Sequence, residues 1–237
     1  RDRGISANFE SGKTNLIIGQ SGSGKTVLMK AIVGLHDINK GDIYYGDIHF
    51  NKISFNEKKE LRKKVGMLFQ GSALFDSLTV EENVIFPLNM FTEKTIAEKL
   101  ERTNFCLQRV DMTNSNSLYP SELSGGMKKR VAIARAIALN PQFLFCDEPN
   151  SGLDPRTSIV IDNLIKEITE EYGITTIVNT HDMNSVMGMG DKIIFIYKGH
   201  KWWEGTKEEI FNSDNPELND FVFASKLAKR LRFGKED

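Results

Sequence analysis

The sequence has few cysteines, no long apolar run and no excess of either charge. Only two of its 237 residues are cysteines, Cys106 and Cys146, and they form no CxxC pair. This excludes a disulfide framework and a cysteine zinc site, and it favours a reducing compartment. No apolar stretch approaches the roughly 20 residues that a membrane-spanning helix needs. We therefore expect that the chain does not cross a bilayer by itself.

The charges are nearly balanced, with 31 basic residues against 32 acidic ones and a net charge of -1. Proteins that bind nucleic acids carry a basic surface, so we predict no nucleic-acid partner. Hydrophobic residues make up 40% of the chain and charged residues 27%, which is ordinary for a globular protein. The length is sufficient for a well-buried core.

Short apolar runs alternate with amphipathic helical patterns along the chain. Apolar runs at 14–18, 143–146 and 175–179 predict buried strands, and the patterns at 26–35 and 155–172 predict helices. Strands that alternate with helices are typical of βαβ units. The sequence therefore predicts an α/β fold with a mostly parallel sheet flanked by helices.

Two regions differ from this alternation. Residues from about 79 to 140 are mainly helical in pattern, which predicts a helical sub-domain inserted in the α/β core. Residues 192–204 predict an antiparallel β-hairpin. We interpret residues 1–232 as one domain that contains both regions.

The two ends of the chain carry weaker patterns. Residues 4–9 are expected to form a strand, and residues 218–232 an amphipathic basic helix. The tail, residues 216–237, is open to three interpretations: a helix packed on its own domain, an extension that stabilises a dimer, or a short helix on a membrane surface.

A glycine-rich segment with the pattern GxxxxGKT follows the first predicted strand and opens a helix. It consists of Gly19, Gln20, Ser21, Gly22, Ser23, Gly24, Lys25 and Thr26. Glycines let the backbone N–H groups point into one concavity, and the helix N-terminus adds a positive dipole end. Lys25 places a charge near the β- and γ-phosphates, and the Thr26 hydroxyl can bind Mg²⁺. The segment predicts a phosphate-binding loop for a nucleotide.

The apolar strand at 143–146 is followed by two carboxylates, Asp147 and Glu148. Ligands of open parallel sheets bind beyond the carboxyl ends of the strands. Asp147 is then placed to hold Mg²⁺ directly or through water, and Glu148 to polarise an attacking water. An acidic pair can also be an ordinary strand exit, but its pairing with the phosphate loop favours the catalytic interpretation.

A second anion-binding helix start is predicted at Ser124, Gly125 and Gly126, just before a helical pattern. Ser124 can cap the helix, whose first N–H groups can bind an anion. One ATP does not need two such sites from one chain, so we predict that this one serves the nucleotide of another subunit. The alternative is a plain helix cap after flexible residues.

In their order along the chain, these segments resemble the ATP-binding-cassette (ABC) ATPases. The shared features are the phosphate loop, Gln70, the LSGGM segment at 123–127, the acidic strand end, residues 151–154 and His181. Kinases and GTPases with a phosphate loop lack the LSGGM segment. The resemblance implies a P-loop NTPase core that hydrolyses ATP with Mg²⁺. It also implies a homodimer in which each ATP lies between the phosphate loop of one copy and residues 124–126 of the other.

The resemblance also implies roles for single residues. The predicted catalytic residues are Lys25, Gln70, Glu148 and His181. The predicted metal ligands are Thr26, Gln70 and Asp147. Nucleotide contacts are expected from residues 19–26 together with Gln70, Ser124, Gly125, Gly126, Asp154 and His181. Asp154 is also expected to link the two sites of the dimer and to cap a helix.

Cassettes of this kind power membrane transporters or serve soluble processes such as DNA repair and translation. The soluble members usually carry two cassettes or a long coiled-coil insertion, and this sequence has neither. We therefore predict the ATPase subunit of a transporter. A regulator that binds nucleotide without turnover is disfavoured because both Glu148 and His181 are present.

Residues 68–80 and 119–130 resemble the Mla-type ATPases, which serve phospholipid transport and lipid asymmetry, and the related organic-solvent-resistance ATPases. This implies a peripheral place on the cytoplasmic face of a bacterial inner membrane. The implied partners are integral-membrane permease subunits, which dock beside Gln70, and a lipid-binding subunit that faces the periplasm. An amino-acid or methionine importer is the alternative.

One feature of the family has no match here. Family members stack adenine on an aromatic residue upstream of the phosphate loop. Phe9 is the only aromatic among residues 1–18, and we assign it to a strand. The stacking residue is therefore expected before Arg1.

Overall fold

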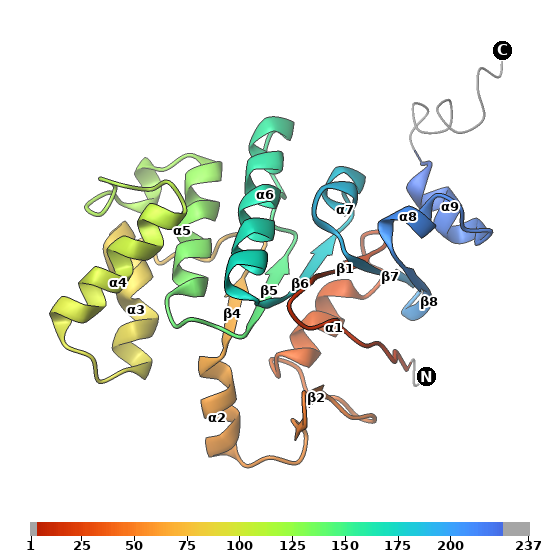
Figure 1. Ribbon diagram of the computed structural model, residues 1–237, viewed down its shortest axis with the longest axis horizontal. Coiled ribbons are helices and arrows are strands. Elements are labelled where there is room, and N and C mark those ends of the chain that lie inside the picture. Colours follow the sequence, from red (N-terminus) through yellow and green to blue (C-terminus); the bar gives the residue numbers. More distant parts are fainter. Residues whose placement is uncertain (1–3, 225–237) are drawn as a thin grey trace.

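The computed structural model describes residues 4–224, and a six-stranded sheet forms its centre (Figure 1). The strand order is β4-β5-β6-β1-β7-β8. The pairs from β4 to β7 are parallel, and β8 is antiparallel to β7. The strands are β1 (Thr14–Ile18), β4 (Val65–Leu68), β5 (Phe143–Asp147), β6 (Thr175–Thr180), β7 (Lys192–Tyr197) and β8 (His200–Gly205).

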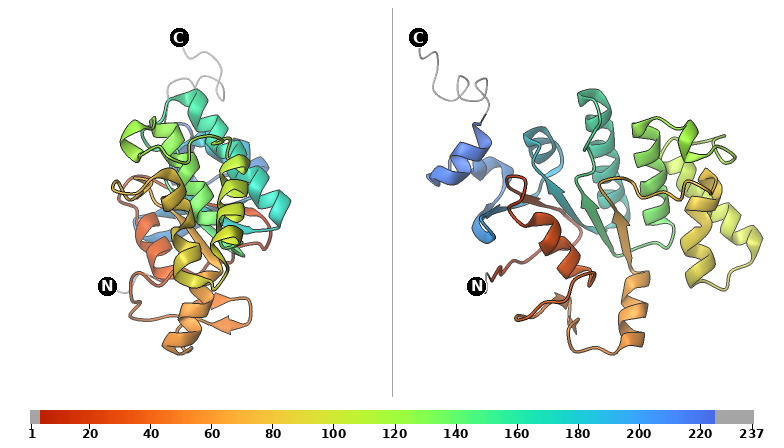
Figure 2. Two further views of the ribbon diagram at one scale, coloured as in Figure 1. Left: turned by 90° about the vertical axis from the view of Figure 1, so that its left-hand side faces the viewer. Right: turned by 180° about the vertical axis from the view of Figure 1, so that it is seen from behind.

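Helices cover both faces of this sheet, as Figures 1 and 2 show. One face carries α1 (Lys25–Ile32) and α2 (Phe55–Lys63), and the other carries α6 (Pro155–Tyr172) and α7 (Met183–Met189). Successive strand residues point to opposite faces. Ile17 therefore packs with Met29 of α1, whereas Leu16 packs in the core beneath α6 and α7. Burial of apolar side chains on both faces is the main stabilising term of such a layered fold.

A group of helices lies beyond β4, at one end of the sheet (Figure 1). It contains α3 (Val80–Phe91), α4 (Ile96–Arg109) and α5 (Gly125–Ile137), with a short 3-10 turn at Pro120–Glu122. Both α3 and α4 begin with a capping box, in which a threonine and a glutamate satisfy each other's backbone N–H groups. These local signals set where the two helices start.

Smaller elements complete the described chain. The two short strands β2 (Tyr44–Tyr45) and β3 (Ile48–His49) pair with each other, apart from the main sheet. Beyond β8 lie α8 (Lys207–Ile210) and α9 (Pro216–Val222). Within residues 4–224, no helix is both long and apolar enough to span a membrane.

The predicted α/β class, the mostly parallel sheet and the antiparallel portion are confirmed. One local prediction fails. Residues 4–9 form no strand, because no other strand pairs with them; instead Ile5 and Phe9 pack against the core beneath α1. Of the helix predicted at 218–232, residues 218–222 belong to α9, which ends at Val222, and residues 225–237 of the tail lie outside the described chain.

Candidate nucleotide-binding site

The predicted phosphate loop connects β1 to α1 and requires glycine at two positions. Gly24 precedes α1 with φ 106°, and no side chain caps the helix, so the first N–H groups of α1 can bind an anion. Gly19 has φ 149°, and a Cβ atom there would lie 2.3 Å from the carbonyl oxygen of Ile196. Any larger residue would displace the backbone of the loop.

Lys25 lies inside the loop, with only 5% of its surface exposed. Its Nζ atom donates a hydrogen bond to the Gly19 carbonyl oxygen at 2.8 Å and lies 3.6 Å from Oε1 of Glu148. A buried ammonium group is costly unless it is paired. The carbonyl and the carboxylate stabilise it here, which places the charge at the centre of the loop.

The carboxyl end of β5 meets the start of α1. Oδ1 of Asp147 accepts a hydrogen bond from Oγ1 of Thr26 at 3.0 Å, although 121 positions separate these residues. A hydroxyl and a carboxylate are oxygen donors of the kind that Mg²⁺ prefers. The structure thus brings together two of the three predicted metal ligands.

Glu148 joins the lysine of the loop to the predicted histidine. Its Oε2 atom lies 2.7 Å from Nδ1 of His181, and its side chain is 13% exposed against 56% for the histidine. The backbone of Glu148 has φ 49°, a left-handed conformation that costs a non-glycine residue on the order of 1–3 kcal/mol. Such strain is concentrated at functional sites, and here it aims the carboxylate at Lys25 and His181.

Gln70, the third predicted metal ligand, has another partner. Its Nε2 atom donates to Oγ of Ser151 at 3.2 Å. No hydrogen bond between described residues joins its side chain to Thr26 or Asp147. In this conformation the glutamine connects the end of β4 with the loop that follows Glu148.

Two cations of α5 hold the backbone of the loop that begins at Gln70. The nearly buried ammonium of Lys129 donates to the Gln70 carbonyl, and burial lowers the pKa of this lysine. The Arg135 guanidinium donates to the carbonyls of Ser72 and Ala73, at 2.8 Å each. Both acceptor residues have positive φ angles, 63° and 48°. The arginine therefore stabilises a strained loop conformation.

The second predicted anion site lies at the start of α5, apart from the phosphate loop. Ser124 caps the helix by accepting a hydrogen bond from the Met127 N–H at 3.3 Å. A Cβ atom on Gly126 would lie 2.6 Å from Cγ2 of Thr157, so α5 and α6 approach closely there. Between described residues, no hydrogen bond or ion pair joins residues 124–126 to the loop at 19–26.

Asp154 caps α6, as its sequence context predicts. Its Oδ1 atom accepts hydrogen bonds from the N–H groups of Arg156 and Thr157 at 3.0 and 3.1 Å. The hydrogen bond from the Thr157 hydroxyl is the main reason why the pKa of this carboxyl is lowered. The aspartate is therefore positioned at the helix start by local contacts alone.

Buried polar atoms without a partner lie near the carboxyl ends of the parallel strands, which we call the carboxyl edge of the sheet. Among the described residues they are Ser23 Oγ, Thr103 Oγ1, Asn150 Oδ1 and Asn179 Oδ1. All except the threonine belong to the phosphate loop, to the strand beside Asp147 or to the loop after Glu148. Each unsatisfied polar group costs about 1–3 kcal/mol. A polar ligand fits this site, because it can supply the missing partners.

Several residues of this edge were not predicted from the sequence. Nδ2 of Asn150 donates to Oδ1 of Asp162 at 2.7 Å and to Oγ of Ser185 at 3.0 Å, which joins the loop after Glu148 to α6 and α7. Burial raises the pKa of Asp162 to about 6. Asn179 is another such residue. For Asp162 and Asn179 the available signal was a polar residue at a position where the pattern predicts an apolar one.

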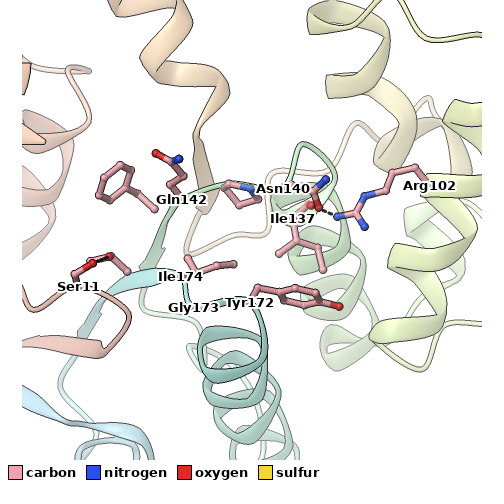
Figure 3. A pocket seen from close by; sticks show the side chains of 11 residues that line it. Ser11, Arg102, Ile137, Asn140, Gln142, Tyr172, Gly173 and Ile174 are labelled. Atoms are coloured by element: carbon pink, nitrogen blue, oxygen red, sulfur yellow. Dashed lines mark hydrogen bonds between the residues drawn. The ribbon is translucent and has the colours of Figure 1, made fainter. Parts of the chain in front are cut away.

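A separate cavity of about 550 Å³ lies at the opposite edge of the sheet, at the amino ends of β5 and β6 (Figure 3). Its lining includes Ser11, Gln142, Tyr172 and Arg102. The guanidinium of Arg102 is bound to backbone carbonyls at the end of α5, those of residues 137 and 138. None of the predicted site residues lines this cavity.

Comparison with known proteins gives relatives along most of the chain. The family model described as "ABC transporter" matches residues 3–151. The methionine import ATP-binding protein MetN of Campylobacter jejuni is 36% identical, over 92% of this chain and 70% of that protein. The probable ribonucleotide transport ATP-binding protein mkl of Mycobacterium leprae is 33% identical, over 92% of this chain and 63% of that protein. The chain spans 61 to 70% of the length of such curated relatives.

Solved structures agree with this relationship. A dimeric structure of the ATP-binding cassette MJ0796 bound to ADP and Pi has a TM-score of 0.78 and 34% identity, covering 85% of this chain and 88% of that one. The cbiO1 protein of Clostridium perfringens, part of an ABC transporter complex, has a TM-score of 0.82 and 28% identity, covering 96% and 90%. The chain therefore belongs to the ABC transporter family and has the fold of its ATP-binding cassettes.

Proposed function

We propose that this chain binds and hydrolyses ATP at the carboxyl edge of its sheet to power a membrane transporter. The convergence of Lys25, Glu148 and His181 carries the proposal. These residues come from three separate segments, yet Glu148 lies 3.6 Å from the lysine and 2.7 Å from the histidine. Charged groups that meet at a strand end beside a phosphate loop are what phosphoryl transfer to water requires.

The proposed chemistry consists mainly of positioning and charge stabilisation. Lys25 and the N–H groups of the loop bind the phosphate oxygens. Thr26 and Asp147 would hold Mg²⁺, which would neutralise phosphate charge, and Gln70 would be a third ligand if its side chain released Ser151. Glu148 accepts a hydrogen bond from the attacking water, and its contact with His181 orients both side chains.

We further propose that two copies of the chain pair head to tail. Residues 124–126 of one copy then cover the phosphates held by the loop of the other, and Asp154 lies between the two sites. The separation of residues 124–126 from the loop within one chain supports this arrangement, as does the dimeric structure of the related cassette.

A mixing experiment tests the shared site. Lys25→Ala disables the phosphate loop, whereas Ser124→Arg disables the helix start, so each variant alone should lose turnover. A mixed dimer has one site with both changes and one site with neither. We therefore expect ATPase activity to reappear on mixing, and no recovery over a full range of ratios would contradict the head-to-tail site.

The proposed partner is an integral-membrane permease on the cytoplasmic face of a bacterial inner membrane. Exposed apolar side chains, Phe75, Phe86 and Met90, lie on α3 and on the loop that follows Gln70. The two phenylalanine rings are 4.8 Å apart. An exposed apolar group of this kind is typical of a protein interface, and it lies where a permease segment is expected.

For the transported molecule we propose phospholipid, with a lipid-binding subunit on the periplasmic side, because residues 68–80 and 119–130 resemble Mla-type ATPases. A small-solute importer is the second candidate, and the MetN relatives favour it. Purification with the neighbouring membrane subunits distinguishes the two. Stimulation of ATPase activity by phospholipid vesicles supports the first, and stimulation by methionine with a soluble binding protein supports the second.

A further inference from the structure

Asn179 is a fully buried asparagine near the end of β6, with no exposed surface. The strand is otherwise made of Thr, Ile and Val, residues suited to a buried sheet. Burying a side-chain amide costs free energy unless its donor and acceptor both find partners. The position therefore calls for a physical reason.

Its donor has such a partner. Asn179 is in register with Asp147 on the neighbouring strand β5, so the two side chains point to the same face of the sheet. Nδ2 of Asn179 donates to Oδ1 of Asp147 at 3.0 Å, and it lies 3.7 Å from the Met29 sulfur. An ionised carboxylate only accepts hydrogen bonds, so this contact fixes which end of the amide faces Asp147.

The same aspartate oxygen receives a second hydrogen bond, from Thr26 at 3.0 Å. Both donors therefore act on Oδ1 and hold the carboxylate in one orientation. Neither of them binds the other oxygen, Oδ2. Thr26 is itself a proposed metal ligand, whereas Asn179 can orient Asp147 without touching the metal, and partners of that second kind commonly control metal affinity.

The acceptor of Asn179, by contrast, has no partner. Its Oδ1 atom is buried and receives no hydrogen bond from any described residue. This oxygen belongs to the same side chain whose Nδ2 atom contacts Asp147. The proposed function requires a hydrated metal ion beside Asp147. Mg²⁺ usually keeps several of its water ligands, and these are hydrogen-bond donors.

We infer that Asn179 is a positioning residue of the metal site, which orients Asp147 through its Nδ2 atom and accepts a hydrogen bond from a metal-bound water through its Oδ1 atom. The inference rests on the proposed function, since it concerns the same Mg²⁺ site. A hydrated metal ion held by Asp147 thus accounts for both the buried Nδ2 donor and the unsatisfied Oδ1 acceptor of Asn179.

The test measures metal binding apart from turnover. Asn179→Leu keeps a similar volume and removes both polar atoms. With Mn²⁺ as the probe, detected by electron paramagnetic resonance in the presence of ADP, we expect metal affinity to fall about 10-fold or more. ADP affinity in EDTA should stay within twofold of the wild-type value, because no phosphate contact is lost.

Thr176→Val is the matched control. Thr176 is equally buried in the same strand, and its hydroxyl bonds to Thr169 on the other side of the sheet. This change removes a buried polar group of β6 without reaching Asp147, so Mn²⁺ affinity should be unchanged even where stability falls.

Unchanged Mn²⁺ affinity in folded Asn179→Leu overturns the inference. Should that variant fail to fold, Asn179→Val decides: valine suits a buried strand and has neither a donor nor an acceptor, so an at least threefold loss is expected, and wild-type affinity overturns the inference. If Mn²⁺ does not bind to the wild-type protein with ADP at all, the proposed function fails together with the inference. If Mn²⁺ binds equally well to the wild type and to the variant, the inference about Asn179 fails and the proposed function stands.

Discussion

The two edges of the central sheet, at the carboxyl and the amino ends of its strands, differ in the charges that they bury. At the carboxyl edge, Lys25, Asp147 and Glu148 are largely buried and contact other site residues. At the amino edge, the cavity of about 550 Å³ is lined by neutral side chains and by Arg102, which is bound to the carboxyl end of α5 (Figure 3). The same strands therefore end in two environments with different chemistry.

This difference shows that the size of a cavity does not locate the functional site here. Burying a charge costs far more free energy than leaving a small empty space, so it persists only where partners or a ligand compensate for it. The strained backbone of Glu148 lies at the carboxyl edge as well. The paired buried charges therefore support the proposal that ATP reacts at the carboxyl edge.

The largest expected effect follows from neutralising Glu148. Glu148→Gln keeps the shape of the side chain but removes its charge, so it should orient water poorly. We expect ATP turnover to fall by about 100-fold or more, as loss of a general base does, and an ATP-bound dimer to accumulate on gel filtration. Turnover at the wild-type rate would contradict the assignment of the reactive edge.

Removing the buried cation should affect binding as well as turnover. Lys25→Ala takes away the charge that the Gly19 carbonyl and Glu148 stabilise inside the loop. Hydrogen bonds to charged groups contribute about 1.5–3 kcal/mol, which corresponds to roughly a 10- to 100-fold loss of nucleotide affinity. Fluorescent ATP binding measures this loss, and Lys30→Ala, at the other end of α1, serves as the control.

The network next to the reactive edge should make stability depend on pH. Burial raises the pKa of Asp162 from 3.8 to about 6, so between these values the folded state binds more protons than the unfolded state. The contribution of this group to stability therefore falls as pH rises from about 4 to about 6.

Asp162→Asn removes this dependence and keeps an oxygen that can accept the hydrogen bond from Asn150. We expect the variant to be more stable than the wild type at pH 8, by about 3 kcal/mol, and to show little gain at pH 4. Urea denaturation at both values measures the difference. A gain of equal size at both pH values would show that protonation of Asp162 is not the cause.

The smallest effect is expected at the amino edge. Gln142 is exposed and lines the cavity there. It precedes the amino end of β5, whereas Asp147 and Glu148 lie at the carboxyl end of that strand. Gln142→Ala should leave ATP turnover within twofold of the wild-type value and change stability by less than about 0.5 kcal/mol. A large loss of ATP turnover would contradict the prediction that only the carboxyl edge takes part in the reaction.

Elements with local end signals were predicted best. The helix predicted at 155–172 matches α6, because Asp154 caps its start, Pro155 suits its first turn and Gly173 ends it in a left-handed conformation. The strand predicted at 4–9 does not form, because a strand has no comparable local signal. A strand needs a paired neighbour, and no neighbour is specified by the residues of the strand itself.

The residues of the candidate site also fall into those that local sequence predicts and those that it does not. The phosphate loop and the acidic strand end are contiguous motifs, so their residue types and spacing were sufficient to predict them. The contacts of Lys129, Asn150 and Asn179 join residues far apart in the chain, for example Asn179 with Asp147 across 32 positions. A single polar residue within an apolar pattern does not reveal its partner.

The sequence by itself determined the α/β class, the main helix and strand positions and the loop chemistry, because these depend on short-range periodicity, helix caps and glycine. Only the tertiary structure decided that Glu148 meets both Lys25 and His181, that Gln70 turns to Ser151, and that Asn179 lies buried against Asp147. Hydrogen bonds and charge pairs depend on distances of a few ångströms, and strand order and register fix these distances only once the chain is folded.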